Sequence, residues 1–131
     1  MRCLITRATG YVGSVLVPKL AAHEVTTLDI CWFGGNPTIK ADIRDGVDLS
    51  GFDAVIHLAA VANDPSGDLD PKLTWEVNAL ATMRLAEASV KAGVKQFIYA
   101  ALEVSTESRM LRKSPRTHRL SRSVTITRPK R

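Results

Sequence analysis

The chain has 131 residues, of which 45% are hydrophobic and 24% are charged. This is enough sequence for one small domain with a core and too little for two. The net charge of +5 is unevenly placed, because residues 1–104 carry 9 Lys and Arg against 12 Asp and Glu, whereas residues 105–131 carry 9 against 1. Such a change of composition predicts a boundary between a body, residues 1–104, and a basic tail, residues 105–131.

Two classes of protein are excluded by what the chain lacks. Its longest apolar stretch, residues 55–62, is much shorter than a membrane span, and the N-terminus has no signal-peptide pattern. The two cysteines, Cys3 and Cys31, are too few for a disulfide framework, and they stand in no CxxC or CxxH spacing that would indicate a zinc site. Free thiols fit a reducing compartment, so we expect a cytoplasmic protein without a membrane anchor.

The first part of the body predicts a strand, a helix and a second strand. Residues 2–6 form a short apolar run that ends at a turn, as a buried parallel strand does. Residues 11–20 place apolar side chains at helical spacing, although Pro18 is expected to kink or shorten the helix. Residues 24–29 are rich in β-branched side chains and end on Asp29, which predicts the second strand.

The second part of the body repeats this order. Residues 39–43 and 53–60 predict two more strands. A helix is expected to begin at Asp70, with Asp as its N-cap and a proline at its first position, and to end near Gly93. Residues 95–100 predict the next strand. The alternation indicates an α/β fold, a Rossmann-like parallel sheet of about five strands with right-handed crossovers.

The turn between the first strand and the first helix carries the chemistry. In Thr-Arg-Ala-Thr-Gly-Tyr-Val-Gly, residues 6–13, Gly10 and Gly13 stand where a dinucleotide fingerprint needs a close backbone approach to pyrophosphate and close helix packing. The N-terminus of the helix then offers N–H groups to phosphate. Asp29 ends the second strand, where an acid would accept the ribose hydroxyls of NAD and repel a 2′-phosphate.

Several such motifs, in order, make the body similar to the NAD-dependent epimerase/dehydratase family, the extended short-chain dehydrogenases that act on nucleotide sugars. The resemblance covers about residues 1–104, the N-terminal half of such an enzyme. The matching stretches are residues 5–13 apart from Arg7, 25–29, 41–45, 55–60, 75–78 and 93–100. An intact relative would use NAD to oxidise a sugar hydroxyl transiently.

The resemblance implies cofactor contacts at eleven residues. Those at the pyrophosphate would be Thr9, Gly10, Tyr11, Val12 and Gly13. Those at the adenosine would be Asp29 on the ribose, with Asp42 and Ile43 at the adenine. Leu58 and Ala59 would lie beside the middle of the cofactor, and Asn78 nearby on the second helix.

Each candidate also has a plain structural interpretation. The two glycines could serve only the turn and its packing, and Asp29 could be a solvated carboxylate at a strand end. His57 is expected to be a strand histidine with its ring nitrogens satisfied, and we give it no catalytic role. The acidic residues at 64, 68 and 70 favour a solvated loop, because no second set of ligands accompanies them. We therefore predict no metal site.

The chain departs from the family pattern where binding and catalysis need it most. Arg7 replaces the first glycine of the fingerprint, and its side chain would either block the pyrophosphate or contact it from the side. We expect weakened binding. Residues 100–104 replace the strand end that carries a catalytic hydroxyl, and neither Tyr11 nor Tyr99 has a lysine four residues on. Without the Tyr-x-x-x-Lys pair, which exchanges the proton in the family, we predict no catalytic residues here.

The basic tail admits two interpretations. As a basic arm, it would make the chain a small non-enzymatic binding module for nucleic acid or another acidic partner. No aromatic residues interrupt its charges and no nucleic-acid module is recognisable, so a nucleic-acid partner is not favoured. Its few apolar residues cannot offset the entropy of ordering, so we expect a disordered tail.

The second interpretation is a shift of reading frame near Val104. If each new codon takes the last base of one residue and the first two of the next, residues 126–130 can spell Tyr-Asn-Lys-Ala-Lys, which is a Tyr-x-x-x-Lys. One consistent set of codons also yields family-like sequence for the residues before it. The composition of the tail would then be an artefact of translation. In either case a sheet that stops after five strands leaves an open edge, which predicts self-association and poor solubility.

Overall fold

A computed structural model describes residues 1–61, 69–100 and 124–127. Its centre is one six-stranded sheet with the order β3-β2-β1-β4-β5-β6. The strands are β1 (Arg2–Thr6), β2 (Glu24–Asp29), β3 (Ile39–Lys40), β4 (Ala54–His57), β5 (Gln96–Tyr99) and β6 (Val124–Thr127). The first five pair in parallel. The predicted Rossmann-like parallel sheet of five strands is therefore confirmed.

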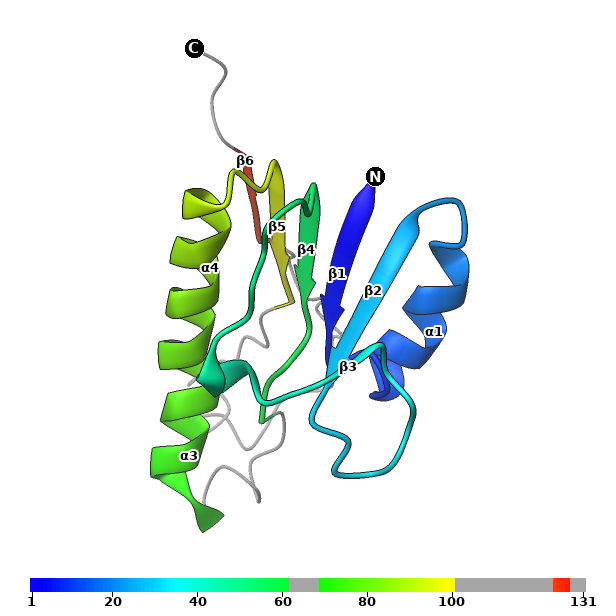
Figure 1. Ribbon diagram of the computed structural model, residues 1–131. Coiled ribbons are helices and arrows are strands. Elements are labelled where there is room, and N and C mark those ends of the chain that lie inside the picture. The colour runs from blue at the N-terminus through cyan, green and yellow to red at the C-terminus, as the bar shows by residue number, and fades with distance from the viewer. Residues whose placement is uncertain (62–68, 101–123, 128–131) are drawn as a thin grey trace, which may run out of the picture.

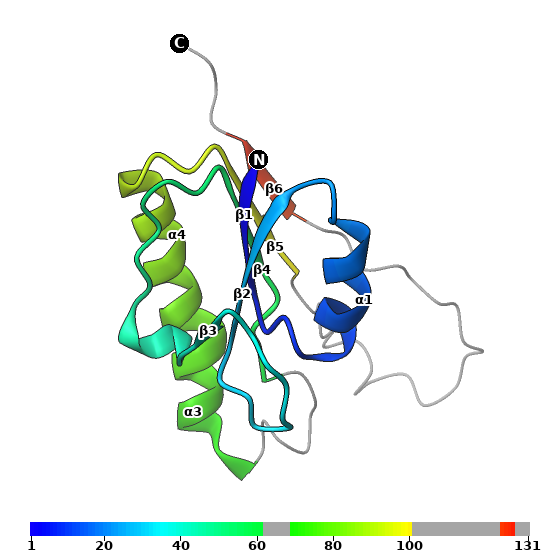
Figure 2. The same cartoon turned by 45° about the vertical axis from the view of Figure 1, so that its right-hand side comes forward.

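Helices cover both faces of this sheet (Figures 1 and 2). Helix α1 (Tyr11–Lys19) lies on one face, and a continuous helical rod lies on the other, made of α3 (Pro71–Trp75), a π-helical segment η2 (Glu76–Ala81) and α4 (Thr82–Lys91). The predicted capping of the second helix is confirmed, because the Asp70 carboxylate accepts the N–H of Leu73 at 2.9 Å. Asp70 therefore serves as the N-cap of α3.

Strands β3 and β4 are shorter than the sequence pattern indicates. Each ends where a side chain accepts hydrogen bonds from backbone N–H groups that would otherwise continue the strand. The Asp42 carboxylate accepts the N–H of Arg44, which starts the short 3-10 helix η1 (Ile43–Asp45) and limits β3 to two residues. The hydroxyl of Thr6 accepts the N–H groups of Leu58 and Ala59, both at 3.1 Å, so these groups leave the ladder and β4 ends at His57.

The basic tail contributes one element that the sequence pattern did not indicate. Residues 124–127 form β6, which pairs antiparallel with β5. The structure describes these four residues of the tail as a paired strand, and the predicted open edge at β5 carries a neighbouring strand. The physical reason is a run of β-branched residues, Val-Thr-Ile-Thr, beside a strand with free backbone groups. The rest of the tail lies outside the described residues.

The core fills the space between the sheet and the rod of α3, η2 and α4. It contains Leu4, Leu28, Val55 and Leu85, all almost fully buried. Most side chains of the central strands β1 and β4 are buried, and the parallel pairing of the two strands places Thr6 beside His57 at their carboxyl ends. No helix in the described ranges has the length and apolar character to cross a membrane.

Candidate functional site

A cavity of about 480 Å³ opens at the carboxyl ends of β1, β2 and β4, the lower end of the sheet in Figure 1. Ligands of open α/β sheets bind at this end, where the chain crosses from one side of β1 to the other. Of the eleven predicted cofactor residues, seven line the cavity: Thr9, Gly10, Tyr11, Asp29, Asp42, Ile43 and Ala59. The other four, Val12, Gly13, Leu58 and Asn78, do not line it.

The turn after β1 brings the amino end of α1 to the cavity. Gly10 is the N-cap of this helix, and no side chain caps the helix N–H groups there. Those groups and the helix dipole favour an anion. Gly13 serves packing, because a Cβ on it would lie 2.4 Å from the carbonyl oxygen of Ala8. One glycine thus leaves the helix end open, and the other lets the helix approach the turn.

Arg7 occupies the first glycine position in a left-handed conformation, with φ of 53°. This backbone region is costly for a residue with a side chain. Its Nη1 donates to the carbonyl oxygen of Ala60 at 2.7 Å, so the side chain bridges the turn after β1 and the segment after β4. Both residues line the cavity. The guanidinium therefore occupies space at the cavity wall that a glycine would leave open.

Asp29 lies at the end of β2, is almost fully buried, and is heavily hydrogen-bonded. Its Oδ2 accepts the N–H and the hydroxyl of Thr9, at 3.0 and 2.6 Å, and its Oδ1 accepts the N–H of Cys31 at 2.9 Å. Burial would raise the pKa of Asp29, but these hydrogen bonds outweigh it and hold the pKa below the ordinary value. Three of about four acceptor positions are taken, which leaves room for one further donor.

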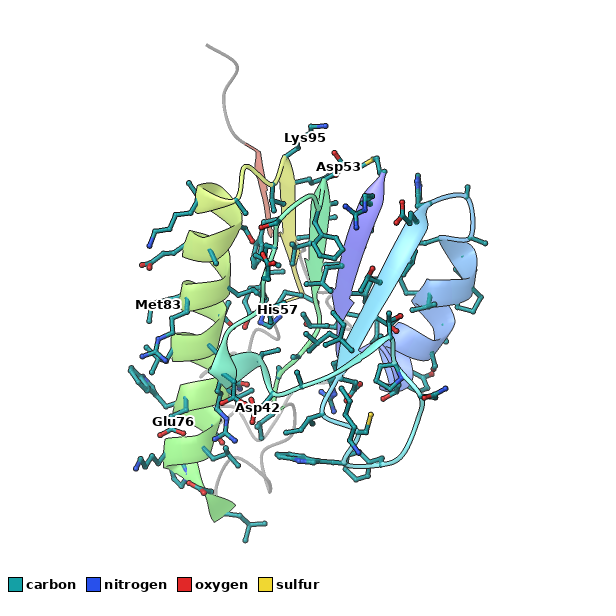
Figure 3. All side chains as sticks on the ribbon, in the orientation of Figure 1. Asp42, Asp53, His57, Glu76, Met83 and Lys95 are labelled. Carbon is teal, nitrogen blue, oxygen red and sulfur yellow. The ribbon has the colours of Figure 1, made fainter. Side chains whose placement is uncertain are left out.

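Asp42 is held by a local ion pair. Its Oδ2 accepts Nε and Nη2 of Arg44 at 2.9 and 2.6 Å, and Arg44 also reaches Glu76 on the helical rod at 3.3 Å. The side-chain hydrogen bond from Arg44 keeps the pKa of Asp42 below its usual range. Figure 3 shows Asp42 beside the helix that carries Glu76. The network fixes the segment after β3 to the rod, which places Asp42 and Ile43 at the cavity.

A buried relay positions the segment after β4. The Thr6 hydroxyl accepts two backbone N–H groups, so its own proton points to Nδ1 of His57, 2.8 Å away. Nε2 of His57 then carries the hydrogen and donates to the hydroxyl of Thr82 on α4 at 2.9 Å. Desolvation lowers the pKa of His57 to about 4. His57 is thus neutral and structural, between the sheet and α4 in Figure 3.

Asn78 does not line the cavity but positions Val61, which does. Its Oδ1 accepts the N–H of Val61 at 2.7 Å, and its Nδ2 donates to the carbonyl of Val61 at 2.9 Å. Val61 lines the cavity, so Asn78 positions a wall without contacting the space. The amide lies in η2, and π-helical turns of this kind often occur at functional sites.

Sequence reasoning missed several residues of the cavity wall. Trp32 and Phe33, in the loop between β2 and β3, line the cavity and are largely exposed. The available signal was the adjacent pair of aromatic residues just after an acid-terminated strand. Within the described ranges no group of His, Cys, Asp and Glu could hold a metal ion. The acidic residues 64 and 68 lie outside the described residues.

Known proteins match this chain over the body. The model of the NAD dependent epimerase/dehydratase family matches residues 3–105. A UDP-glucose 4-epimerase of Mycolicibacterium smegmatis is 35% identical over 121 residues, covering 77% of this chain and 38% of the relative. An L-arabinose 1-dehydrogenase (NAD(P)(+)) of Haloferax volcanii is 33% identical, covering 76% of this chain and 40% of the relative.

Solved structures match the same region. The UDP-glucose 4-epimerase of Thermus thermophilus, in complex with NAD, has a TM-score of 0.66 and 34% identity over 72% of this chain and 35% of its own. DesIV of Streptomyces venezuelae, a dTDP-glucose 4,6-dehydratase with NAD bound, has a TM-score of 0.65 and 29% identity, covering 72% and 37%. The chain spans about two fifths of the length of these curated relatives. With the matched fold, glycine turn and acid-terminated β2, the chain belongs to the NAD-dependent epimerase/dehydratase family.

Proposed function

We propose that the cavity binds NAD, and that these 131 residues retain binding in weakened form without the catalysis of the family. The observation that carries the proposal is the shared cavity of the open α1 N-terminus and the buried carboxylate of Asp29. Solved relatives with this fold contain NAD. When bound, NAD supplies a reversible hydride acceptor.

The residues present fit most of a dinucleotide. The N–H groups at the start of α1, around Gly10, would face the pyrophosphate. Asp29 has one acceptor position left for a ribose hydroxyl, fewer than the two that the resemblance implies. Asp42 and Ile43 would hold the adenine end, and Ala59 the middle. Leu58 would contribute through its backbone, which Thr6 holds.

Arg7 is the reason for weak binding. Its stem lies over the helix cap, with Cγ 3.1 Å from the position of a Cβ on Gly10, and its guanidinium bridges to Ala60. A pyrophosphate approaching the helix end must displace this bridge or share the space. Breaking a charge-assisted hydrogen bond costs about 1.5–3 kcal/mol, equivalent to roughly ten- to a hundredfold in affinity.

The proposal of lost catalysis rests on residues rather than on the cavity. Neither tyrosine of the chain has a lysine four positions on, and residues 100–104 read Ala-Ala-Leu-Glu-Val. No group in the chain therefore matches the proton-transfer pair of the family. Some of the relatives act on nucleotide sugars, as their names state. We propose no sugar substrate for these 131 residues.

We further propose that a change of reading frame near Val104 produced the tail. The family match ends at residue 105, beside the predicted break, and the excess of basic residues begins there. The coding DNA tests this directly. We expect third-position bases after codon 104 that restore Tyr-Asn-Lys-Ala-Lys in the shifted frame, and bases incompatible with that reading would refute the frameshift.

Isothermal titration with NAD and NADP tests the binding proposal. We expect weak binding of NAD and weaker binding of NADP, because the Asp29 carboxylate repels a 2′-phosphate. Asp29→Asn should lower the affinity for NAD about tenfold and reduce the discrimination between the two. Asp48→Asn is the matched control, since Asp48 is an exposed carboxylate outside the cavity. No heat of binding with either nucleotide would refute the proposal.

A further inference from the structure

Two adjacent aromatic residues form one wall of the cavity and have no assigned role. Trp32 is 60% exposed and Phe33 is 95% exposed, yet both line the cavity that Asp29 and Asp42 also line. With Tyr11, which is 90% exposed, three of the seven aromatic residues in the chain surround this one space. Large apolar side chains exposed together commonly mark a binding surface.

The backbone holds this aromatic pair in a defined place. The N–H of Gly34 donates to the carbonyl of Cys31 at 3.2 Å, which makes Trp32 and Phe33 the two central residues of a β-turn. On one side, the N–H of Cys31 is held by Oδ1 of Asp29. We call this segment, residues 31–34, the aromatic turn.

The other side of the aromatic turn rests on the glycine-containing turn after β1. Gly35 has φ of +111°, and a Cβ on it would lie 2.6 Å from Cγ2 of Thr9. Further along, the N–H of Thr38 donates to the Thr27 hydroxyl at 2.8 Å. The loop is therefore anchored to β2 and to the α1 turn while its two rings stay exposed, which is the preorganisation that a binding wall needs.

The position of the aromatic turn matches the adenine end of the ligand. It belongs to the loop that connects β2 with β3. These strands are paired in parallel so that Asp29 lies opposite Lys40, and the N–H of Ala41 donates to the Asp29 carbonyl at 3.1 Å. The Asp29 carboxylate and the segment of Asp42 and Ile43 are thus neighbours, and Trp32 and Phe33 line the same cavity. A flat base is the part of NAD that aromatic rings recognise without needing hydrogen bonds.

We propose that the aromatic turn is a stacking wall for the adenine ring, with Trp32 and Phe33 supplying affinity at the end of the site remote from Arg7. This inference rests on the proposed NAD site and names the residues that grip its adenine end. If stacking on the aromatic turn supplies most of the binding free energy, the adenosine half of NAD dominates its affinity. ADP-ribose, which keeps adenosine and lacks nicotinamide, is then expected to bind about as well as NAD.

Trp32 itself provides the first readout. Trp75 is the only other tryptophan, is similarly exposed at 58%, and lies on α3 outside the cavity. In the full-length Trp75→Phe protein, NAD and ADP-ribose should quench the remaining fluorescence saturably, whereas nicotinamide mononucleotide, which lacks adenine, should not. The Trp32→Phe protein, which retains Trp75, should show no saturable change. Equal quenching of both proteins would overturn the inference.

Titration calorimetry provides the second readout. Trp32→Ala and Phe33→Ala should each weaken NAD and ADP-ribose by roughly tenfold, the scale of base–aromatic stacking, while Trp75→Ala leaves both affinities unchanged. If the wild type binds NAD and both cavity variants bind it equally well, the stacking wall is refuted and the NAD site stands. If the wild type binds no nucleotide, the NAD site and the stacking wall are both refuted. Sedimentation showing that Trp32→Ala only dissociates a dimer, at unchanged NAD affinity, would assign the aromatic turn to a second copy instead.

Discussion

Arg7 combines a strained backbone with a side chain that spans the cavity wall. Arg7→Gly should relieve both, because glycine adopts φ of 53° freely and leaves no guanidinium beside Gly10. We expect NAD to bind about tenfold more tightly by titration calorimetry. In denaturant unfolding, relief of the left-handed strain, on the order of 1 kcal/mol, should offset part of the loss of the Arg7–Ala60 hydrogen bond.

The control for this variant is Arg7→Ala, which removes the guanidinium but keeps a Cβ in the left-handed region. It should improve NAD binding and be about 1 kcal/mol less stable than Arg7→Gly, because both variants lose the hydrogen bond to Ala60 and only alanine keeps the strain. Weaker NAD binding in both variants would show that the guanidinium holds phosphate, and would contradict the role of Arg7 in weakening the site.

His57 predicts a pH dependence of stability. Its pKa is lowered to about 4 by burial, whereas an unfolded histidine titrates near 6.5. Because the unfolded state binds the proton more readily, the contribution of neutral His57 is fully present above pH 6.5 and is lost as the pH falls toward 4. The loss should reach about 3 kcal/mol over that window.

Denaturant unfolding at pH 7, 5.5 and 4 measures this effect, with His57→Gln as the comparison, since glutamine does not titrate. The wild type should lose more stability on acidification than the variant does. Parallel pH profiles for the two proteins would mean that His57 is not the titrating group.

At the scale of residues, much of the site was predictable and its hydrogen bonding was not. Asp29, Gly10 and Asp42 followed from the order of motifs, and all three line the cavity. That Thr9 takes up Oδ2 of Asp29 could not be predicted, because it depends on the rotamer of a side chain brought there by tertiary packing. The position of Trp32 likewise depends on a turn that no periodicity encodes.

Among the elements, α1 depends most on a single residue. Gly13→Ala would place a Cβ 2.4 Å from the Ala8 carbonyl oxygen, so the helix must move away from the turn after β1. We expect a loss of about 1–3 kcal/mol in denaturant unfolding, together with weaker NAD binding, because the N-terminus of α1 shifts from the cavity.

Ser14→Ala is the neighbouring control on the same helix. Ser14 is exposed, and its hydroxyl bonds only locally to the Tyr11 carbonyl. Its replacement should change stability by no more than about 0.5 kcal/mol. Equal stability of Gly13→Ala and Ser14→Ala would refute the proposal that Gly13 is needed for close packing of α1 against the turn after β1.

The elements show where periodicity is informative and where it fails. Buried runs and capping residues located β1, β2, β5 and both long helices. Periodicity could not show where β4 stops, since the hydroxyl of Thr6, fifty-one residues away from His57, ends the ladder. It also missed η2 and β6, because a single inserted turn and an antiparallel edge strand arise from packing rather than from a local pattern.

For the molecule as a whole, β6 determines how the sheet edge is presented. Removing residues 105–131 deletes β6 and leaves the backbone of β5 without its antiparallel neighbour. We expect the shortened chain, residues 1–104, to self-associate more strongly, because an unpaired strand is a template for another chain. Sedimentation velocity over a range of concentrations measures this, and a shortened chain that stays monomeric while the full chain associates would contradict it.

The central claim is that the glycine-containing turn, the start of α1 and Asp29 together form the NAD site. A crystal structure of the 131-residue protein with NAD tests it most directly. We expect pyrophosphate oxygens at the N-terminus of α1 beside Gly10, and an adenosine ribose hydroxyl within hydrogen-bond distance of the Asp29 carboxylate. Electron density for NAD elsewhere, or a ribose remote from Asp29, would contradict it.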